Sequence, residues 1–321
     1  MGGDFGPQVT MPASLQALEE YEEMRAFLVG DLEKISSYLV GISADVMERI
    51  EVVAATQVVG MGESPSAVLR SKKDSSMRVA LELVKSGKAD ACVSAGNTGA
   101  LMALSRYVLR TCETIDRPAI MSAIPTSRGH TYMLDLGANV ECDSEQLYQF
   151  ALIGNAVLKN LHHIDSPRIA LLNVGEEDIK GNDTVRRANE LLKSDPGLNY
   201  VGYVEGTDIL SGKVDVIVCD GFVGNIALKS IEGVAKFFLA ELRHVIKKNL
   251  FTKLLGFLAM PLFKGLYARF DPGKYNGASL VGLNGVVVKS HGSASVNEYV
   301  IAIGQAVEEV RNNIPGVIEK L

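Results

Sequence analysis

The chain has 321 residues, and its 47% hydrophobic and 22% charged residues are typical of a folded globular protein, which excludes a wholly disordered chain. Its 32 Lys and Arg residues against 38 Asp and Glu residues give a net charge of −6, which disfavours binding of nucleic acid. No run of about 18 apolar residues occurs and the four cysteines form no CxxC pair, so neither a membrane-spanning helix nor a zinc knuckle is predicted.

Short apolar runs alternate with helical patterns along most of the chain. Eight runs are predicted to be buried strands, at 26–29, 52–55, 91–93, 120–123, 133–136, 169–174, 216–219 and 286–288. Six segments predict helices, at 75–86, 100–110, 144–160, 184–193, 225–249 and 295–313. Because continuous apolar runs suit strands that are buried on both faces, the pattern predicts an α/β layered fold with a mostly parallel sheet.

We expect a single domain over residues 1–321, because no internal repeat and no low-complexity linker interrupts the pattern. Breaks rich in Pro and Gly at 195–197 and 271–273 are interpreted as turns. The glycine-rich segment 1–7 is a turn of the kind that normally follows a strand. A leading strand before residue 1 is therefore expected and is missing from this sequence.

Glycines and small polar residues follow five of the predicted strands. These turns are at 94–99, 137–139, 175–183, 220–225 and 289–293. In a parallel sheet such turns meet at the carboxyl edge, where α/β proteins bind ligands. Glycine permits close approach of the backbone, and a following helix N-terminus offers free N–H groups to an anion. The turns together predict a phosphate-like anion site at one edge, and ordinary turn chemistry is the alternative.

Several catalytic motifs are absent, namely GxxxxGK[ST], GxGxxG, GxSxG and HExxH. Catalysis without a cofactor or a covalent enzyme intermediate is therefore predicted. Cys142 and Cys219 flank candidate turns, and a small buried apolar role is favoured over a nucleophilic one. The acidic cluster 176–178 could hold a cation, but a solvated loop is favoured and no metal is predicted. His162 and His163 are interpreted as a surface pair at a helix end.

These turns carry a family resemblance that runs over essentially the whole chain. The matching segments are 1–4 (MGGD), 72–77 (KKDSSM), 94–100 (SAGNTGA), 135–140 (DLGANV), 173–182 (NVGEEDIKGN), 220–229 (DGFVGNIALK), 282–285 (GLNG) and 291–293 (HGS). They resemble the bacterial phosphate acyltransferases of phospholipid synthesis. The resemblance implies conversion of acyl-acyl-carrier-protein and inorganic phosphate into acyl phosphate and free carrier protein, with no cofactor.

The resemblance also implies an architecture and a set of partners. The fold would be similar to that of phosphotransacetylases and of isocitrate/isopropylmalate dehydrogenases, and the protein would be a homodimer that visits the membrane surface. A membrane glycerol-3-phosphate acyltransferase would be a further partner. Members of the family usually carry a short strand before the MGGD turn, and this sequence begins at that turn.

The implied chemistry requires little beyond positioning. Phosphate is a usable nucleophile at neutral pH, and a thioester is an activated acyl donor. The enzyme must hold phosphate against the carbonyl carbon, stabilise the oxyanion and help the thiolate to leave. Positioning of this kind can supply roughly 7–11 kcal/mol of the barrier.

Three residues are the predicted catalytic groups. Lys180 is expected to contact phosphate, because the family implies a functional lysine at this place, and a surface lysine is the alternative. Asn225 is expected to orient phosphate or stabilise the oxyanion, and a helix N-cap is the alternative. His291 is expected to protonate the leaving thiolate or bind phosphate, and a structural histidine in a turn is the alternative.

Further substrate contacts are expected in the same turns. The candidates are Asp4, Lys72, Lys73, Ser75, Ser76, Ser94, Gly96, Asn97, Thr98, Asn139, Asn182, Asp220 and Gly224. The segment 72–76 is interpreted as a second anion-binding corner, and a basic helix start is the alternative. Asp4, Asp135 and Asp220 could orient the cations, and helix capping competes with that interpretation.

The segment 236–274 is basic on an acidic protein, because its eight Lys and Arg residues face only two acidic residues. Within it, an amphipathic helical segment at 237–266 is predicted to contact a membrane or a carrier protein. The contact candidates are Lys247, Lys248, Lys253, Leu254, Leu255, Phe257 and Leu258. Gly256 and Pro261 are expected to break the helix and leave an apolar tip.

This segment has three alternative interpretations, namely core or dimer packing, reversible membrane contact and docking of a carrier protein. A membrane-facing tip with carrier docking nearby is favoured. The leading interpretation is an acyl-ACP:phosphate acyltransferase at the inner face of the cell membrane, in the cytoplasm where thiols stay reduced. An acyl-CoA phosphotransacetylase is the alternative enzyme, and a catalytically silent scaffold of lipid synthesis is the alternative from another class.

Overall fold

The computed structural model describes residues 1–260 and 272–321. Its strands are β1 (Ala26–Gly30), β2 (Ile50–Ala54), β3 (Ala91–Ser94), β4 (Ala119–Thr126), β5 (Gly129–Leu134), β6 (Arg168–Leu172), β7 (Asn199–Val204), β8 (Val216–Val218), β9 (Ala278–Val281) and β10 (Val286–Lys289). The helices before β9 are α1 (Pro7–Glu20), α2 (Leu32–Tyr38), α3 (Ala44–Glu48), α4 (Pro65–Ser71), α5 (Ser76–Lys85), α6 (Thr98–Leu109), α7 (Ser144–Leu161), α8 (Asp183–Ser194), α9 (Gly221–Lys247) and α10 (Leu250–Leu258). After β10 follow α12 (Val296–Arg311) and α13 (Ile314–Ile318), and 3-10 turns lie at Gly206–Asp208 and Pro272–Tyr275.

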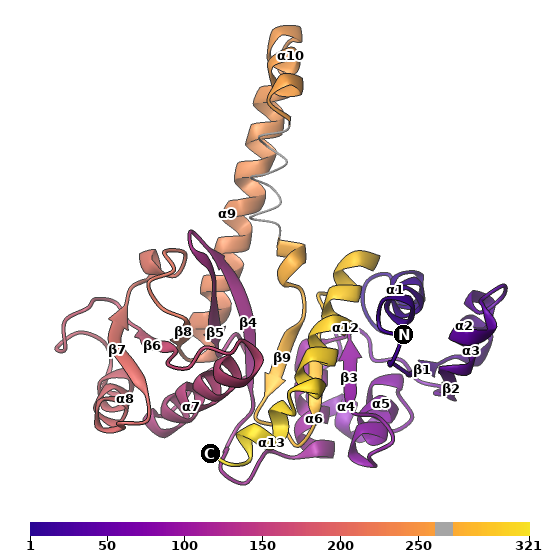
Figure 1. Cartoon of the computed structure of the whole chain (residues 1–321), viewed down its shortest axis with the longest axis horizontal. Helices are drawn as coiled ribbons and strands as arrows, with labels where there is room; N and C mark the ends of the chain where they lie inside the picture. Colours follow the sequence, from indigo (N-terminus) through magenta and orange to yellow (C-terminus); the bar gives the residue numbers. More distant parts are fainter. Residues whose placement is uncertain (261–271) are drawn as a thin grey trace.

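The strands form an eight-stranded sheet in the order β3-β10-β9-β4-β5-β8-β6-β7 and a separate pair, β1-β2. Neighbours pair in parallel within β3-β10, within β5-β8-β6-β7 and within β1-β2. The predicted α/β layered fold with a mostly parallel sheet is confirmed. Figure 1 shows the two halves of the structure side by side, with α7 and α8 in one half and α1, α5 and α6 in the other.

The sheet is buried on both faces because its apolar side chains alternate between two cores. Ile217 of β8 packs into one core with Leu101 of α6, whereas Val216 and Val218 pack into the other core with Phe150 of α7. All five of these side chains are fully buried. Burial on both faces explains why the strands are continuous apolar runs in the sequence.

Three antiparallel pairs lie between β10 and β5, namely β10-β9, β9-β4 and β4-β5. Because three is an odd number, β3 and β10 run opposite to β5, β8 and β6. The predicted meeting of all five turns at one edge is therefore wrong, and two groups of turns leave the sheet in opposite directions. We call 135–139, 173–183 and 219–225, which follow β5, β6 and β8, the Lys180 rim. We call 94–99 and 289–293, which follow β3 and β10, together with 1–6, the His291 rim.

A slot separates the free edge of β1 from the free edge of β3. A cavity of about 120 Å³ lies there, lined by 27–29 of β1, 92–94 of β3 and residues of α1 and α5. Met1 closes one end, because a Cβ on Gly30 would lie 2.3 Å from the Met1 Cγ atom. Burial lowers the pKa of the Met1 amino group.

Helices α9 and α10 form an arm that projects far from the sheet (Figure 1). Asn249 begins α10 with a capping box shared with Thr252, and this cap separates the two helices. The predicted break at Gly256 is wrong, because α10 continues through it and one glycine costs a helix interior only about 1 kcal/mol. Large apolar side chains are exposed along the arm, at Val234, Phe237, Phe238, Val245, Leu250, Phe251, Leu254, Leu255, Phe257 and Leu258.

The rest of the predicted amphipathic segment, including Pro261, Leu262, Phe263, Lys264 and Leu266, lies outside the described residues. Of the helices that the structure describes, none combines the length and the apolar character needed to cross a membrane.

Candidate functional site

Asp135 organises the centre of the Lys180 rim. Its carboxylate is fully buried and accepts hydrogen bonds from the backbone N–H groups of Ile120 at 2.9 Å, Ala138 at 3.0 Å and Asn139 at 2.7 Å. The Asn139 side-chain amide also donates to it at 3.0 Å. Burial raises the pKa of Asp135, and these donors act in the opposite direction. Asp135 and Asn139 therefore hold the turn after β5 against β4, and both side chains are engaged within the fold.

The N-terminus of α9 rests directly on this turn because two glycines permit the approach. A Cβ on Gly221 would lie 2.6 Å from the carbonyl oxygen of Asn139, and one on Gly224 would lie 1.9 Å from that of Asp135. Asp220 caps the helix, since its carboxylate accepts from the N–H of Val223 at 2.8 Å. The capping interpretation is confirmed for Asp220.

Asn225 lies inside α9, which begins at Gly221, so its interpretation as the helix N-cap is wrong. The side chain faces the turn after β5, because a Cβ on Gly137 would lie 3.5 Å from the Asn225 Cγ atom. Asn225 is half-buried, and no hydrogen bond joins its amide to another described residue. The amide is therefore available to a ligand. Of the first four N–H groups of α9, those of Gly221, Val223 and Gly224 already donate to Asn139 or Asp220, and only that of Phe222 has no partner among the described residues.

The loop that carries Lys180 is closed by Asn173, whose side-chain amide donates to the carbonyl oxygens of Gly175 at 3.1 Å and Lys180 at 3.3 Å. Asn182 then caps α8 through the N–H of Val185 at 2.9 Å. The Lys180 side chain is 45% exposed, and its ammonium lies 2.8 Å from a Glu177 carboxylate oxygen. The hydrogen bond to Glu177 raises the pKa of Lys180, so this group is a cation at neutral pH.

Lys180 and Asn225 come from loops that leave the same edge of the sheet. β6 and β8 are adjacent and parallel, with Leu171 opposite Val218 near their carboxyl ends. No contact joins the two side chains within the described residues, and neither lines the slot cavity. The arrangement offers an anion one cation, one amide and a helix N-terminus from neighbouring strands.

The acidic cluster 176–178 is divided among three lysines. Glu176 pairs with Lys213 at 3.9 Å, Glu177 with Lys180 at 2.8 Å and Asp178 with Lys193 at 2.8 Å. These carboxylates are largely exposed and do not converge. Across residues 1–260 and 272–321, no three His, Cys, Asp or Glu side chains are grouped so that they could hold a metal ion. The interpretation as a solvated loop is supported.

Both thiols near the Lys180 rim are poor nucleophiles. Burial raises the pKa of Cys142 to about 12 and that of Cys219 far above its ordinary value. Each thiol donates to a backbone carbonyl oxygen, that of Asn139 at 3.8 Å for Cys142 and that of Asp135 at 3.5 Å for Cys219. The apolar role predicted for these cysteines fits their surroundings.

The His291 rim contains one exposed imidazole. The Nδ1 atom of His291 lies 2.8 Å from the Ser293 hydroxyl oxygen, and its backbone N–H donates to the Asn276 side chain at 2.9 Å. The N-terminal turn joins this rim through the N–H of Asp4, which donates to the carbonyl oxygen of Gly292 at 2.9 Å. No described residue bonds the Nε2 atom of His291, so this atom is available to a ligand or a proton.

Lys289 is a buried cation at this rim that the sequence analysis did not single out. It is 8% exposed, and its ammonium donates to the carbonyl oxygens of Ser290 and, at 3.5 Å, Ala95. Burial lowers the pKa of Lys289 to about 8, and the nearby carboxylate of Asp4 opposes this shift. The available sequence signal is a lysine that directly continues the apolar run 286–288.

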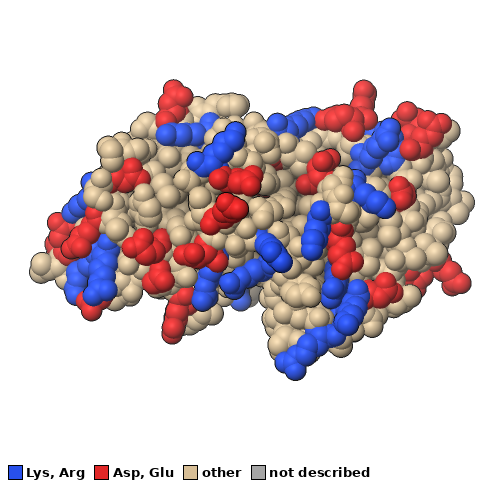
Figure 2. Space-filling model, turned by 90° about the horizontal axis from the view of Figure 1, so that it is seen from below, with Lys and Arg blue, Asp and Glu red and all other residues tan. Residues whose placement is uncertain are grey.

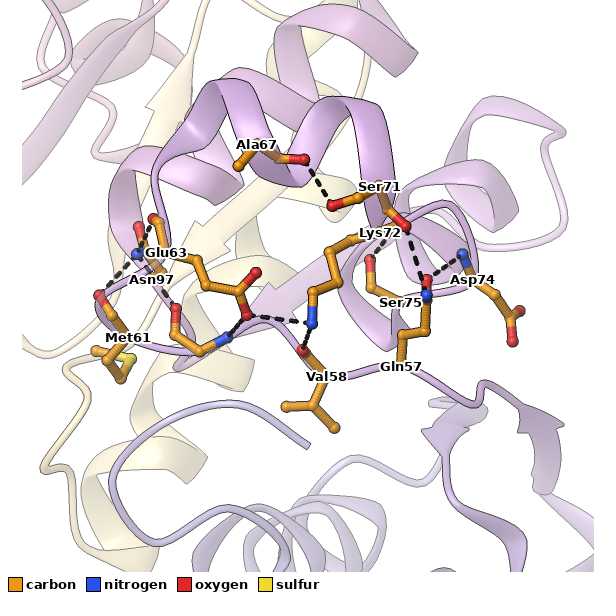
Figure 3. Close-up of polar contacts among 11 residues, drawn as sticks. Gln57, Val58, Met61, Glu63, Ala67, Ser71, Lys72, Asp74, Ser75 and Asn97 are labelled. Carbon is orange, nitrogen blue, oxygen red and sulfur yellow. Dashed lines mark hydrogen bonds and ion pairs between the residues drawn. The ribbon is translucent and has the colours of Figure 1, made fainter.

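Asn97 joins two segments far apart in the sequence, as Figure 3 shows. Its side-chain amide donates to the carbonyl oxygens of Met61 at 2.7 Å and Glu63 at 3.0 Å, and its side-chain oxygen accepts from the N–H of Ala100 at 2.9 Å. Ser94 accepts from the N–H of Gly96 at 3.2 Å. Thr98, which begins α6, is exposed. Asn97 is therefore already engaged at both ends of its amide.

The segment 72–76, predicted as an anion-binding corner, is bonded into the same cluster (Figure 3). The Lys72 ammonium lies 3.2 Å from the Glu63 carboxylate and donates to the carbonyl oxygen of Val58 at 3.0 Å. Ser75 caps α5, and the N–H of Ser76 donates to Gln57 at 3.1 Å. Lys73 is exposed. These contacts favour the alternative, in which the segment is a basic helix start that holds the loop 57–63.

His162 and His163 differ from the predicted surface pair. His163 is exposed, but His162 is half-buried and its Nε2 atom bonds the Tyr132 hydroxyl. Burial lowers the pKa of His162 to about 4, so it is neutral at physiological pH. The side chain therefore packs between α7 and β5 as a structural group.

Figure 2 shows basic and acidic side chains interspersed over the face seen from below, with no field of one sign. Six Lys and Arg residues lie on the described part of the arm, at Lys229, Lys236, Arg243, Lys247, Lys248 and Lys253. The basic residues predicted for this segment are thus spread along α9 and α10.

Comparisons with known proteins identify the family to which this chain is similar. The family model described as "Fatty acid synthesis protein" matches residues 1–316. The chain is 53% identical over 315 residues to a phosphate acyltransferase of Nitrosococcus oceani, covering 98% of this chain and 92% of that one. It is 53% identical to a phosphate acyltransferase of Pseudomonas putida, covering 98% and 94%.

Solved structures share the fold at low sequence identity. A phosphotransacetylase from Streptococcus pyogenes superposes with a TM-score of 0.61 at 18% identity, covering 94% of this chain and 92% of that one. A 4-hydroxythreonine-4-phosphate dehydrogenase from Salmonella typhimurium gives 0.52 at 15% identity, covering 96% and 97%. The predicted likeness to phosphotransacetylases and to dehydrogenase-like folds is confirmed.

Proposed function

The chain belongs to the family of phosphate acyltransferases, and from that premise we propose that it transfers a fatty acyl group from acyl-acyl-carrier-protein to inorganic phosphate. It is an acyltransferase of fatty acid and phospholipid synthesis, and phosphate and an acyl donor are its substrates. The proposal adds the identity of the donor, the residues that act and the place where they act.

The observation that carries the proposal is the pairing of the Lys180 loop with the start of α9 on adjacent strands. A dianionic phosphate would exchange with Glu177 at the Lys180 ammonium and accept a hydrogen bond from the Phe222 N–H at the start of α9. The Asn225 amide would orient phosphate or donate to the developing oxyanion. A phosphate oxygen then forms a bond to the carbonyl carbon, the carbon–sulfur bond breaks, and the thiolate receives a proton.

The arm supports carrier protein as the donor. Carrier proteins of this kind are acidic, and the described arm carries Lys236, Arg243, Lys247, Lys248 and Lys253 beside exposed apolar side chains. An acyl-CoA phosphotransacetylase remains the alternative enzyme, because free CoA would not need a basic docking surface.

The arm also supports a peripheral place at the inner face of the cell membrane. Basic residues near an anionic lipid surface add about 1 kcal/mol each, and the apolar face of α10 could enter the interface. We propose a homodimer that releases acyl phosphate at this surface to a membrane glycerol-3-phosphate acyltransferase.

The test is formation of acyl phosphate, trapped with hydroxylamine, from phosphate and either long-chain acyl-ACP or the matching acyl-CoA. We expect acyl-ACP to give the higher kcat/KM, with formation dependent on added phosphate. Equal or faster reaction with acyl-CoA would instead support the phosphotransacetylase alternative.

A further inference from the structure

Arg117 is a cation beside the Lys180 rim to which the proposed function gives no role. β4 is antiparallel to β5, so the start of β4 lies next to the end of β5. The Leu136 N–H donates to the carbonyl oxygen of Ile120 at 3.0 Å, so the pairing continues past the end of β5. Arg117 precedes β4, which begins at Ala119, and it therefore lies beside the turn that follows β5.

The residues on both sides of Arg117 anchor its backbone. The Asp116 carboxylate accepts a hydrogen bond from the Gln149 side-chain amide at 3.0 Å. The Pro118 carbonyl oxygen accepts one from the Asn139 side-chain amide at 2.8 Å. A proline also restricts the residue before it to an extended backbone. The position of Arg117 is therefore fixed without any use of its own side chain.

The guanidinium of Arg117 is available to a ligand. Its side chain is exposed, and no hydrogen bond or ion pair joins it to another residue of 1–260 or 272–321. Burial raises the pKa of the Cys142 thiol, and the charge of Arg117 acts in the opposite direction. Asp135 and Asp220 act on the same thiol, so Arg117 lies in one neighbourhood with the turn after β5 and the start of α9.

The charges at the Lys180 rim leave a need for a second cation. A dianionic phosphate brings two negative charges, whereas Lys180 brings one positive charge that it already shares with Glu177 at 2.8 Å. The Asp220 carboxylate adds a negative charge at the start of α9, where the Phe222 N–H is the free donor. An arginine suits this need, because its planar fork binds two oxygens of one phosphate at once.

The strand order places the two cations on either side of the neutral donors. β4, β5, β8 and β6 are neighbours in that order (Figure 1). Arg117 precedes β4 and Lys180 follows β6, whereas Phe222 and Asn225 follow β8, which lies between them. β4 and β6 are three strand spacings apart, about 14 Å, so two long side chains are needed to meet at one ligand between them.

From these observations, and resting on the proposed function, we propose that Arg117 is the second phosphate-binding cation of the site. Its guanidinium holds two oxygens of phosphate and the Lys180 ammonium holds a third. The fourth oxygen is left to attack the carbonyl carbon of the thioester. Both cations remain on the phosphoryl group when the acyl phosphate has formed.

The test is phosphate binding by Arg117→Gln, measured in two ways. Calorimetry gives the Kd of inorganic phosphate with no acyl donor present, and the acyl phosphate assay gives the KM for phosphate and for acyl-ACP. We expect the Kd and the KM for phosphate to rise about ten- to a hundredfold, with an unchanged KM for acyl-ACP. Arg117→Lys should lie between this variant and the wild type, because it keeps the charge and loses the fork.

The matched control is Arg25→Gln. Arg25 is also exposed and without an ion pair among the described residues, and it precedes β1 in the other half of the structure. The change removes the same charge from the chain, so it should leave the Kd for phosphate at the wild-type value. Melting temperatures show whether each variant is folded, and Arg117→Lys carries the test if Arg117→Gln is not.

Three results would overturn the inference. The first is an Arg117 variant that binds phosphate with the wild-type Kd. The second is a rise in the KM for acyl-ACP alone, which would place the guanidinium on the donor. The third is an equal loss in Arg25→Gln, which would assign the effect to net charge. Failure of the wild type to form acyl phosphate would instead reject the proposed function, whereas the calorimetric comparison would still test Arg117.

Discussion

The two rims begin as the same kind of sequence, a glycine-rich turn after a buried strand, yet the structure uses them differently. On the His291 rim, Asn97 and Lys289 are bonded to the protein's own backbone. On the Lys180 rim, the buried carboxylate of Asp135 makes the bonds to the backbone. Lys180 and Asn225 stay accessible. A glycine-rich motif therefore predicts a turn, but the bonding partners of each side chain decide whether that side chain can bind a ligand.

Replacing Asp135 should have the largest effect. In Asp135→Ala, the buried N–H groups of Ile120, Ala138 and Asn139 lose their acceptor, and each unsatisfied donor costs about 1–3 kcal/mol. We expect the free energy of unfolding to fall by at least about 3 kcal/mol in urea titrations. Asp220→Ala, which removes only a helix cap, should lose about 1 kcal/mol. Equal losses in the two variants would contradict the special role of Asp135.

Replacing Lys180 or Asn225 should remove activity without removing stability. Loss of one donor at a developing charge typically costs about 100- to 1,000-fold in kcat. We expect losses of that size in acyl phosphate formation for Lys180→Ala and Asn225→Ala, with unchanged melting temperatures. Lys193→Ala, which breaks the neighbouring pair with Asp178, is the matched control and should keep normal turnover. Wild-type turnover in either test variant would remove that residue from the mechanism.

A change at the tip of the arm should weaken membrane binding. Leu258 is 67% exposed on α10, and burying a leucine in an apolar phase is worth about 1.5–3 kcal/mol. Leu258→Glu should therefore weaken sedimentation with anionic liposomes by about tenfold or more. Val40→Glu, at an 84% exposed position on the body, is the control and should bind as the wild type does. Unchanged binding of Leu258→Glu would reject the membrane role.

The buried ammonium of Lys289 should appear in the pH dependence of stability. Its folded-state pKa of about 8 lies below the ordinary value of 10.5. Between pH 8 and pH 10.5 the folded protein therefore binds fewer protons than the unfolded chain does. The cost of burying this cation is fully present below pH 8 and is relieved as the pH rises toward 10.5. We expect Lys289→Met to lose this relief, so its stability relative to wild type should fall between pH 8 and 10. A constant difference across that range would contradict the shifted pKa.

The smallest effect is expected at the Lys72 and Glu63 pair. Both side chains are partly exposed, at 26% and 32%, and such pairs contribute up to about 1 kcal/mol. We expect Lys72→Met to lower the free energy of unfolding by no more than about 1 kcal/mol and to leave the KM for phosphate unchanged. A tenfold rise in that KM would restore the anion-binding interpretation of this corner.

Much of the fold was predictable because burial on both sheet faces leaves a clear apolar pattern. The predicted strand 91–93 matches β3, and the helix 144–160 matches α7, to within one or two residues. β7 and β9 were not predicted, because β7 contains two tyrosines and a glycine at the sheet edge and the short β9 includes the polar Ser279. The three antiparallel pairs that reverse the sheet depend on tertiary pairing, which apolar runs do not encode.

The candidate residues could be found from the sequence, but their environments could not. Asp220 was recognised as a possible cap, and its bond to Val223 confirms this. The engagement of Lys72 depends on Glu63, nine residues away in the chain, and that of Lys289 on Ala95 in another strand's turn. Contacts of this kind arise from packing between elements, so spacing within a motif cannot reveal them.

The most direct test of the central claim is a crystal structure of the protein with arsenate, whose anomalous signal locates a phosphate analogue. The account predicts arsenate in contact with the Lys180 ammonium and near the Asn225 amide at the start of α9. Arsenate bound elsewhere, with Lys180 still paired to Glu177, would contradict it.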